Sequence, residues 1–286
     1  MDLFLPQTIE EAVGLLAQHE GARCISGGAT LVAMMNAGLE EPSALISLRQ
    51  IPGLAGISRE PDGSVRIGAM TRHVDTATSK VFKDGQCVVP RAAVRIANRV
   101  VRNMGTMGGS ISFADPAADY LAALTAAGAA IEIASPRGKR TLPVSGFVTD
   151  WYTTALASDE IVTSISVPAM PAGSIGHYEK LARVSGDFAI VSIAIIARFE
   201  SDICSFLRVA VGGCGPAPLR LREAEVVLEG SRLNASLIGE AGRMLVAISD
   251  PVDDVRASGE YRRKVLPRLL AKALIQIQQT QHAEVA

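Results

Sequence analysis

The chain has no marked excess of either charge and no long apolar run. Its 28 Lys and Arg residues nearly balance 29 Asp and Glu residues, so electrostatics gives no reason to expect nucleic acid or an anionic membrane as a partner. No apolar stretch approaches the roughly 18 to 20 residues that span a bilayer, and the first residues lack the basic-then-apolar order of a secretion signal. We expect a cytoplasmic protein without a membrane span, acting on a small or neutral ligand.

Cysteine is scarce and is not arranged to bind a metal. Cys24, Cys87, Cys204 and Cys214 stand singly, without the CxxC spacing of zinc and iron–sulfur sites. We therefore expect reduced thiols and no metal site on this chain.

The usual signatures of nucleotide and hydrolytic sites are also missing. The sequence contains no GxxxxGK[ST], no GxGxxG that opens a helix, no HExxH and no GxSxG. The segment GGCGPAP at residues 212–218 is rich in glycine, but its prolines prevent a regular helix from starting there. Hydrolysis is unsupported and we assign no catalytic residue. We interpret His73 and His177 as surface or hydrogen-bonded side chains.

The chain is long enough for two domains. The stretch from residue 167 to residue 176 is rich in proline and glycine, so we place the domains at residues 1–172 and 173–286. The first domain contains a strand, a tight turn and a helix over residues 22–38. It ends with an alternating strand in which Ile161, Thr163, Ile165 and Val167 share one face.

The second domain is expected to be α+β. Residues 188–199 and 205–215 have the composition of long antiparallel strands, and two helical patterns follow them. Pro267 lies inside the last helical pattern, where we expect a kink or a new helix start.

Two glycine-rich turns are the strongest local signal. One is Gly27-Gly28-Ala29-Thr30, after a short strand, and the other is Thr106-Met107-Gly108-Gly109-Ser110. Paired glycines allow positive φ and close approach to a ligand, and outward-facing backbone N–H groups bind phosphate oxygens. Each turn alone has an ordinary structural explanation. Together they favour a dinucleotide held by its diphosphate.

Two aspartates follow the second turn. Asp115 is interpreted as the N-cap of a helix that starts at Pro116. Asp119 would lie one turn inside that helix, where its carboxylate can accept hydrogen bonds from ribose or ribityl hydroxyls.

These segments match a known family. SGGATLVAMMNAGL together with RNMGTMGGSISFADPAADYLAAL resembles the FAD-binding subunit of the molybdenum hydroxylases, the medium subunit of carbon monoxide dehydrogenase and of xanthine-dehydrogenase-like enzymes. The resemblance continues through YEKLARVSGDFAIVSIA, VAVGGCGPAPLR and DDVRASGEYRRKVLPRLLAKAL, so it covers nearly the whole chain.

The resemblance implies a fold and a cofactor. Residues 1–172 would form an FAD-binding domain of the vanillyl-alcohol-oxidase type, and residues 173–286 a smaller α+β domain like the C-terminal domain of the carbon monoxide dehydrogenase flavoprotein. The two glycine motifs would hold the FAD diphosphate, Asp119 its polar chain, Phe113 another part of FAD, and Val162 and Lys180 its rings. The residues implied to bind FAD are Ile25, Ser26, Gly27, Gly28, Ala29, Thr30, Leu31, Thr106, Gly108, Gly109, Ser110, Phe113, Asp119, Val162 and Lys180.

The sequence departs from the family pattern RNRGTIGGNLANADPAAD. Met104 replaces an arginine, and Ser110 and Phe113 replace asparagines. Ala29-Thr30 also differs from the usual first motif, and Val184 interrupts a paired arginine. The changes at Ser110 and Phe113 remove asparagine side chains that could bond to the cofactor, and Ala29-Thr30 alters side-chain contacts while leaving the backbone of the first motif intact.

By the same resemblance, the chain is an electron-transfer subunit. A large molybdopterin-binding subunit would oxidise the substrate, a small subunit with [2Fe-2S] clusters would carry the electrons to FAD, and NAD or another acceptor would receive them. The complex would be a dimer of heterotrimers. One alternative is a self-sufficient FAD oxidase, for which His73, His177 and Tyr178 are acid–base candidates. Another is a nucleotide-binding or assembly protein that does not turn over.

Overall fold

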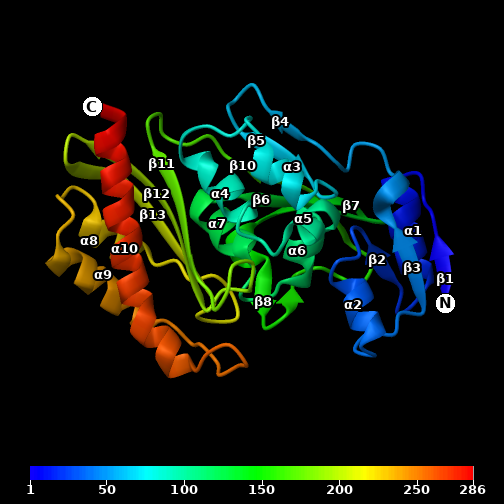
Figure 1. Ribbon diagram of the computed structural model, residues 1–286. Helices are drawn as coiled ribbons and strands as arrows, with labels where there is room; N and C mark the ends of the chain where they lie inside the picture. The colour runs from blue at the N-terminus through cyan, green and yellow to red at the C-terminus, as the bar shows by residue number, and fades with distance from the viewer. Residues whose placement is uncertain (286) are drawn as a thin grey trace.

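The computed structural model describes residues 1–285 and mixes helices with four small sheets. Figure 1 shows them in a row, with the sheet of the N-terminal strands at one end, a second sheet in the middle, and a third sheet with the C-terminal helices at the other end. The α+β expectation is confirmed.

The elements alternate in short lengths before residue 170 and become longer after it. The first part contains β1 (Asp2–Phe4), α1 (Ile9–Gln18), β2 (Arg23–Ile25), α2 (Leu31–Asn36), β3 (Ala44–Ser47), η1 (Leu48–Gln50), β4 (Ile57–Arg59), β5 (Val65–Gly68), α3 (His73–Thr78), η2 (Asp84–Cys87), α4 (Val88–Ala93), α5 (Arg99–Met104), α6 (Met107–Phe113), α7 (Asp119–Ala127), β6 (Ala130–Ser135), β7 (Gly138–Pro143), η3 (Val144–Gly146), β8 (Val148–Asp150), β9 (Thr153–Thr154) and β10 (Ile161–Val167). The second part contains β11 (Ile175–Leu181), β12 (Val191–Glu200), β13 (Ile203–Gly212), α8 (Arg222–Leu228), α9 (Ala235–Ala247) and α10 (Gly259–Val285).

The N-terminal sheet is parallel, with strand order β1-β3-β2. Its connections are the helices α1 and α2. The Thr8 hydroxyl caps α1 by accepting from the N–H of Glu11. The predicted strand, turn and helix over residues 22–38 are present, and Gly38 follows α2 with a positive φ of 67°.

The middle sheet is antiparallel, with order β4-β5-β10-β6-β7. Its central strand, β10, is buried on both faces. The register against β6 shifts between Val162 and Ser164, so the strict alternation that we expected across β10 is interrupted by a bulge.

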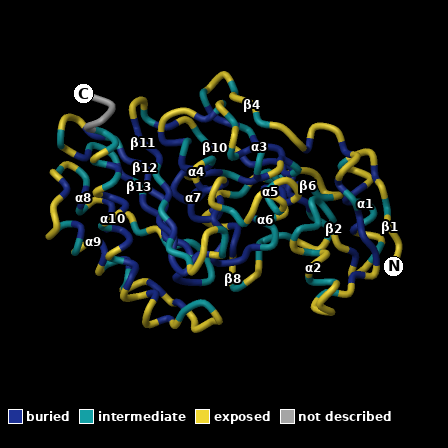
Figure 2. The backbone as a smooth tube through the Cα atoms, viewed as in Figure 1, coloured by how far each residue is buried: buried dark blue, intermediate teal, exposed yellow. Residues whose placement is uncertain are grey.

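The third sheet, β11-β12-β13, is antiparallel, and the two predicted long strands form its β12–β13 hairpin. Helices α4 and α7 cover one face and α8 and α10 the other. Ala194 and Ile196 therefore enter the core of the first part, while Ile193 and Ile195 enter the core of the second. Figure 2 shows that this region is where buried backbone is concentrated. Burial on both faces explains the continuous apolar run of β12.

The last helix contains Pro267, where we expected a kink or a new helix start. No new helix starts at Pro267, because α10 continues through it from Gly259 to Val285. A Cβ on Gly242 of α9 would lie only 2.8 Å from the Cβ of Pro267. The two helices are thus held at a close crossing by a glycine and a proline. Residues 168–174 connect β10 to β11, and we retain the boundary at 172/173 as a proposal.

Candidate functional site

A cavity of about 1000 Å³ opens between the two glycine motifs and the adjacent β8–β9 hairpin. Its wall contains every residue predicted to bind FAD except Ile25 and Lys180. Ile25 lies just behind the wall, with its Cδ1 atom 3.7 Å from the position of a Cβ on Gly28. The structure therefore brings together segments that are far apart in the sequence.

The first motif presents free backbone amides to this cavity. It links β2 to α2, and Gly28 turns the chain with a φ of +71°. Within the described chain, the N–H groups of residues 27–31 make no hydrogen bond, and the Thr30 side chain does not cap α2. Consecutive unpaired N–H groups at a glycine turn form a site that attracts phosphate oxygens. This part of the prediction agrees with the geometry.

The second motif is built differently from the prediction. It is the start of helix α6 and not an open turn, and Thr106 caps this helix by accepting from the Gly109 N–H at 3.1 Å. The Met107 and Gly108 N–H groups donate to carbonyls of the segment before α3, at 2.9 and 2.8 Å. Our expectation of outward-facing amides is therefore wrong here. Small residues of α6, including Ser110, face the cavity. Phe113 at the end of the helix faces it as well.

Two glycines serve packing between elements more than approach to a ligand. A Cβ on Gly27 would overlap the carbonyl oxygen of Met104, and a Cβ on Gly108 would lie 2.6 Å from the Cβ of Ala69. The backbone of the first motif thus touches the end of α5 directly. Of the residues that depart from the family pattern, Met104 contributes this carbonyl, whereas Val184 lies on the surface with 67% of its area exposed.

The aspartates also differ from their predicted positions. Helix α7 begins at Asp119, with Ala118 as its N-cap residue. Asp115 instead accepts from the Ala117 N–H at 2.8 Å and closes a turn before the helix. Burial raises the pKa of the Asp115 carboxyl, and the hydrogen bond to Ala117 opposes that rise.

Asp119 lines the cavity, and each of its carboxylate oxygens already accepts one hydrogen bond from a protein group. The Tyr178 hydroxyl donates to Oδ1 at 2.7 Å, and Lys180 Nζ donates to Oδ2 at 3.0 Å. Burial raises the pKa of the Asp119 carboxyl, and the Lys180 ammonium opposes the rise. Only 5% of Lys180 is exposed. Both donors belong to β11, so this ion pair joins the second part of the chain to the cavity wall.

His73 is a further member of the wall, and our interpretation of it as a surface or hydrogen-bonded residue is wrong. It is buried, its Nδ1 atom has no hydrogen-bond partner among the described residues, and its ring meets Tyr120 edge-on at 5.3 Å. Burial, followed by the Arg102 guanidinium, lowers the pKa of His73 to about 4. His177 is half-buried and lies outside the cavity wall.

Aromatic rings stand on one side of the cavity. Phe113 and Tyr152 make an edge-to-face contact with centroids 5.5 Å apart, and Phe188 carries the Arg256 guanidinium 4.9 Å above its ring. Sequence reasoning missed Tyr152, Phe188 and the wall segment at residues 96–97. The sequence did contain a signal for Phe188, because this residue directly follows the Ser-Gly-Asp turn in a segment that resembles the family.

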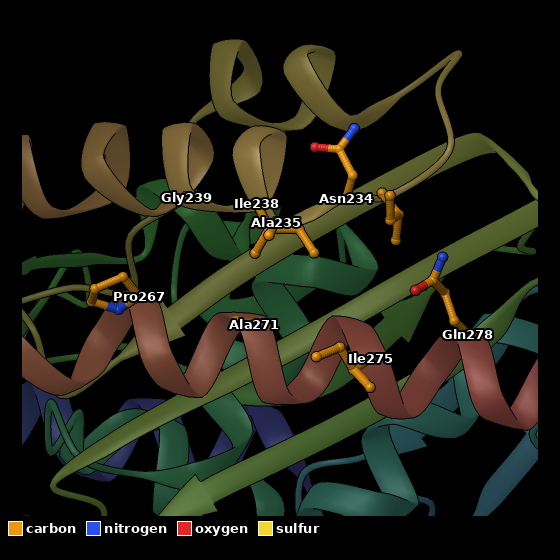
Figure 3. A pocket seen from close by; sticks show the side chains of 9 residues that line it. Asn234, Ala235, Ile238, Gly239, Pro267, Ala271, Ile275 and Gln278 are labelled. Atoms are coloured by element: carbon orange, nitrogen blue, oxygen red, sulfur yellow. The ribbon is translucent and has the colours of Figure 1, made fainter.

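A second, smaller groove lies elsewhere. It has a volume of about 240 Å³ and runs between α9 and α10, where Pro267, Ala271 and Ile275 face Ile238 (Figure 3). Its lining contains no charged side chain, so it offers little to a polar ligand. We therefore place the functional site in the larger cavity.

The described residues show neither a metal-binding cluster nor a membrane-spanning helix. They contain no group of three or more His, Cys, Asp and Glu side chains placed to hold a metal, and no disulfide joins their cysteines. None of the described helices is long and apolar enough to cross a membrane.

The large cavity has the parts that FAD requires. Unpaired amides of residues 27–31 suit a diphosphate, apolar and aromatic side chains suit flat rings, and the volume suits a ligand of this size. The residues present therefore fit the cofactor implied by the sequence resemblance.

The comparisons with known proteins agree with this geometry. Residues 1–170 match the FAD binding domain in molybdopterin dehydrogenase, and residues 176–277 match the CO dehydrogenase flavoprotein C-terminal domain. The 6-hydroxypseudooxynicotine dehydrogenase complex subunit alpha of Paenarthrobacter nicotinovorans is 35% identical over 96% of this chain and 94% of its own. The xanthine dehydrogenase FAD-binding subunit of Escherichia coli O157:H7 is 27% identical over 93% and 92%.

A solved structure agrees over the whole fold. A chain of carbon monoxide dehydrogenase from Hydrogenophaga pseudoflava superposes with a TM-score of 0.93, covers 98% of both chains, and is 33% identical. The resemblance stated from the sequence is confirmed. The chain belongs to the family of FAD-binding subunits of the molybdenum hydroxylases, the oxidoreductases that include the carbon monoxide and xanthine dehydrogenases.

Proposed function

We propose that this chain relays electrons through FAD held in the large cavity. A large molybdopterin-binding partner subunit oxidises the organic substrate, and a small partner subunit with [2Fe-2S] clusters delivers the electrons. NAD or another acceptor then removes them. The assembly is a dimer of heterotrimers in the cytoplasm. The proposal is supported by the match over nearly the whole chain to subunits of multi-component dehydrogenases.

The observation that carries the proposal is the row of unpaired N–H groups at residues 27–31 in the cavity wall. We place the FAD diphosphate on these amides, with Ser26 and Ile25 fixing the strand that precedes them. Gly108, Gly109 and Ser110 at the start of α6 line the same region and leave room for the cofactor beside these amides. When bound, FAD supplies the redox chemistry.

The remaining predicted residues hold and orient the cofactor. Asp119 offers its carboxylate edge to a hydroxyl of the FAD polar chain, and Val162 and Phe113 provide apolar walls for its rings. Lys180 lies behind Asp119 and keeps that carboxylate in place. The chain's own contribution is thus to bind the cofactor, set its orientation and exclude water from its buried side.

The test is to purify the chain from its natural source under mild conditions and analyse what accompanies it. We expect FAD, iron, molybdenum and two further chains, and we expect the flavin absorption to bleach when the substrate of the complex is added. Flavin reduction by a substrate in the isolated chain would instead favour a self-sufficient oxidase. A chain with bound FAD but no partners and no reduction would favour an assembly role.

A further inference from the structure

One wall of the cavity is a strained stretch of backbone between α4 and α5. Ile96 and Ala97 both line the cavity. Ala97 has a φ of +41°, in the left-handed region that a residue with a Cβ seldom adopts. Such a conformation persists only where surrounding groups hold it.

Two cationic side chains hold this stretch by its carbonyl groups. Lys180 Nζ donates to the Arg95 carbonyl at 2.8 Å. Arg102 Nη1 donates to the Ile96 and Ala97 carbonyls at 2.7 and 2.8 Å. The three consecutive carbonyls of residues 95–97 therefore each accept a hydrogen bond from a cationic side chain. Neither cation lines the cavity itself. Hydrogen bonds from charged donors are the strong ones.

The two cations come from different parts of the chain. Arg102 belongs to α5 of the first part, whereas Lys180 belongs to β11 of the second. The second part touches the stretch again at Gly186, where a Cβ would lie 2.8 Å from the Ala97 carbonyl oxygen. The second part thus contacts this wall at two points, Lys180 and Gly186.

We propose that Lys180 and Arg102 are positioning residues that hold residues 95–97 in the shape required by FAD, so that the C-terminal domain acts on the cofactor site through the Lys180–Arg95 contact. This inference deepens the proposed function, since it takes the cavity to be the FAD site. It differs from the implied contact of Lys180 with the flavin rings, because here Lys180 acts through the wall.

The test uses the full chain and measures the Kd for FAD and the midpoint potential of the bound flavin. Lys180→Met and Arg102→Met each remove a charged hydrogen bond, so we expect each to weaken FAD binding about tenfold. Ala97→Gly removes the cost of the positive φ and should recover most of that loss in either background. The flavin potential should change little throughout.

A matched control is available on the opposite face of the same sheet. Lys272→Met removes an exposed ammonium that pairs with Glu179 at 3.0 Å, next to Lys180 in β11. It should leave the Kd for FAD unchanged.

Each result decides the matter. Loss of affinity in Lys180→Met alone, with a shifted flavin potential and no recovery by Ala97→Gly, would show direct contact with the flavin and overturn the inference. Full affinity in both variants would overturn it as well. If Lys180→Met fails to fold because Asp119 is left without its cation, Arg102→Met with and without Ala97→Gly decides alone. Absence of FAD binding in the unaltered chain would instead refute the proposed function.

Discussion

The backbone of Gly27 rests directly against the carbonyl group of Met104, with no room for a side chain between them. This contact fixes the distance between the first glycine motif and the end of α5, and Gly105 and Thr106 then lead into α6. The two glycine motifs are therefore one structural unit. The cofactor site depends on this packing as much as on the unpaired amides of the first motif.

Replacing Gly27 with alanine should damage both stability and binding. The added methyl group must displace backbone, so we expect a loss of about 2 kcal/mol or more in the free energy of unfolding. FAD content should fall as well. Gly14→Ala is the control, because nothing lies within 4 Å of its Cβ position in helix α1. That change should be neutral or stabilise by about 0.5 to 1 kcal/mol. Thermal unfolding and released flavin measure the two effects.

The cavity should bind FAD more tightly than FMN, because only FAD carries a diphosphate. FMN lacks the second phosphate and the adenosine, so it cannot occupy the whole row of amides at residues 27–31. We expect FMN to bind at least about tenfold more weakly than FAD, and ADP to compete with FAD. Fluorescence titration of the flavin-free chain measures both. Equal affinity for FMN and FAD would place the diphosphate elsewhere.

The pH dependence of stability should include a contribution from His73. Its pKa is lowered from 6.5 to about 4 in the folded chain, so the unfolded chain holds the proton more tightly. Stability is therefore lost as the pH falls from about 6.5 towards 4, by about 3 kcal/mol in total, and is unaffected above that range. His73→Phe should lack this loss. Denaturant unfolding at pH 7 and at pH 4.5 compares the two proteins, and an equal decrease in both would contradict the assignment.

Removing a buried carboxylate in the second part should lower the free energy of unfolding without lowering the flavin content of the folded chain. Glu225 accepts from the Val209 N–H at 2.9 Å and from Arg220 at 2.7 Å, and only 1% of Glu225 is exposed. Glu225→Ala leaves these donors unpaired and should cost about 2 kcal/mol or more. Glu200→Ala breaks an exposed pair with Arg198 and should cost less than about 1 kcal/mol. Flavin content per folded chain should stay constant in both.

The sequence was sufficient for elements whose pattern is local. The turn through Gly28, helix α2 and the β12–β13 hairpin follow from glycine, capping and strand composition, and all are present. Most residues of the cavity wall were also predicted, because the family resemblance assigns both glycine motifs and Asp119 to one FAD site.

What failed depended on contacts between distant segments. The N–H groups of Met107 and Gly108 in α6 donate to carbonyls of the segment before α3, and no local sequence pattern predicts that pairing. Asp115 does not cap α7, because the turn at residues 115–118 delays the start of that helix to Asp119. Lys180 is buried because Asp119 and the Arg95 carbonyl pair with it across the two parts, and no local pattern predicts these contacts.

The most direct measurement is the absorption spectrum of the purified chain before and after denaturation, beside that of Gly109→Trp. Gly109 lines the cavity and its Cβ position meets only the Thr106 hydroxyl, so an indole there enters the cofactor site. We expect released FAD from the native chain and none from the folded variant. A folded native chain that carries no flavin and takes up no added FAD would contradict the account.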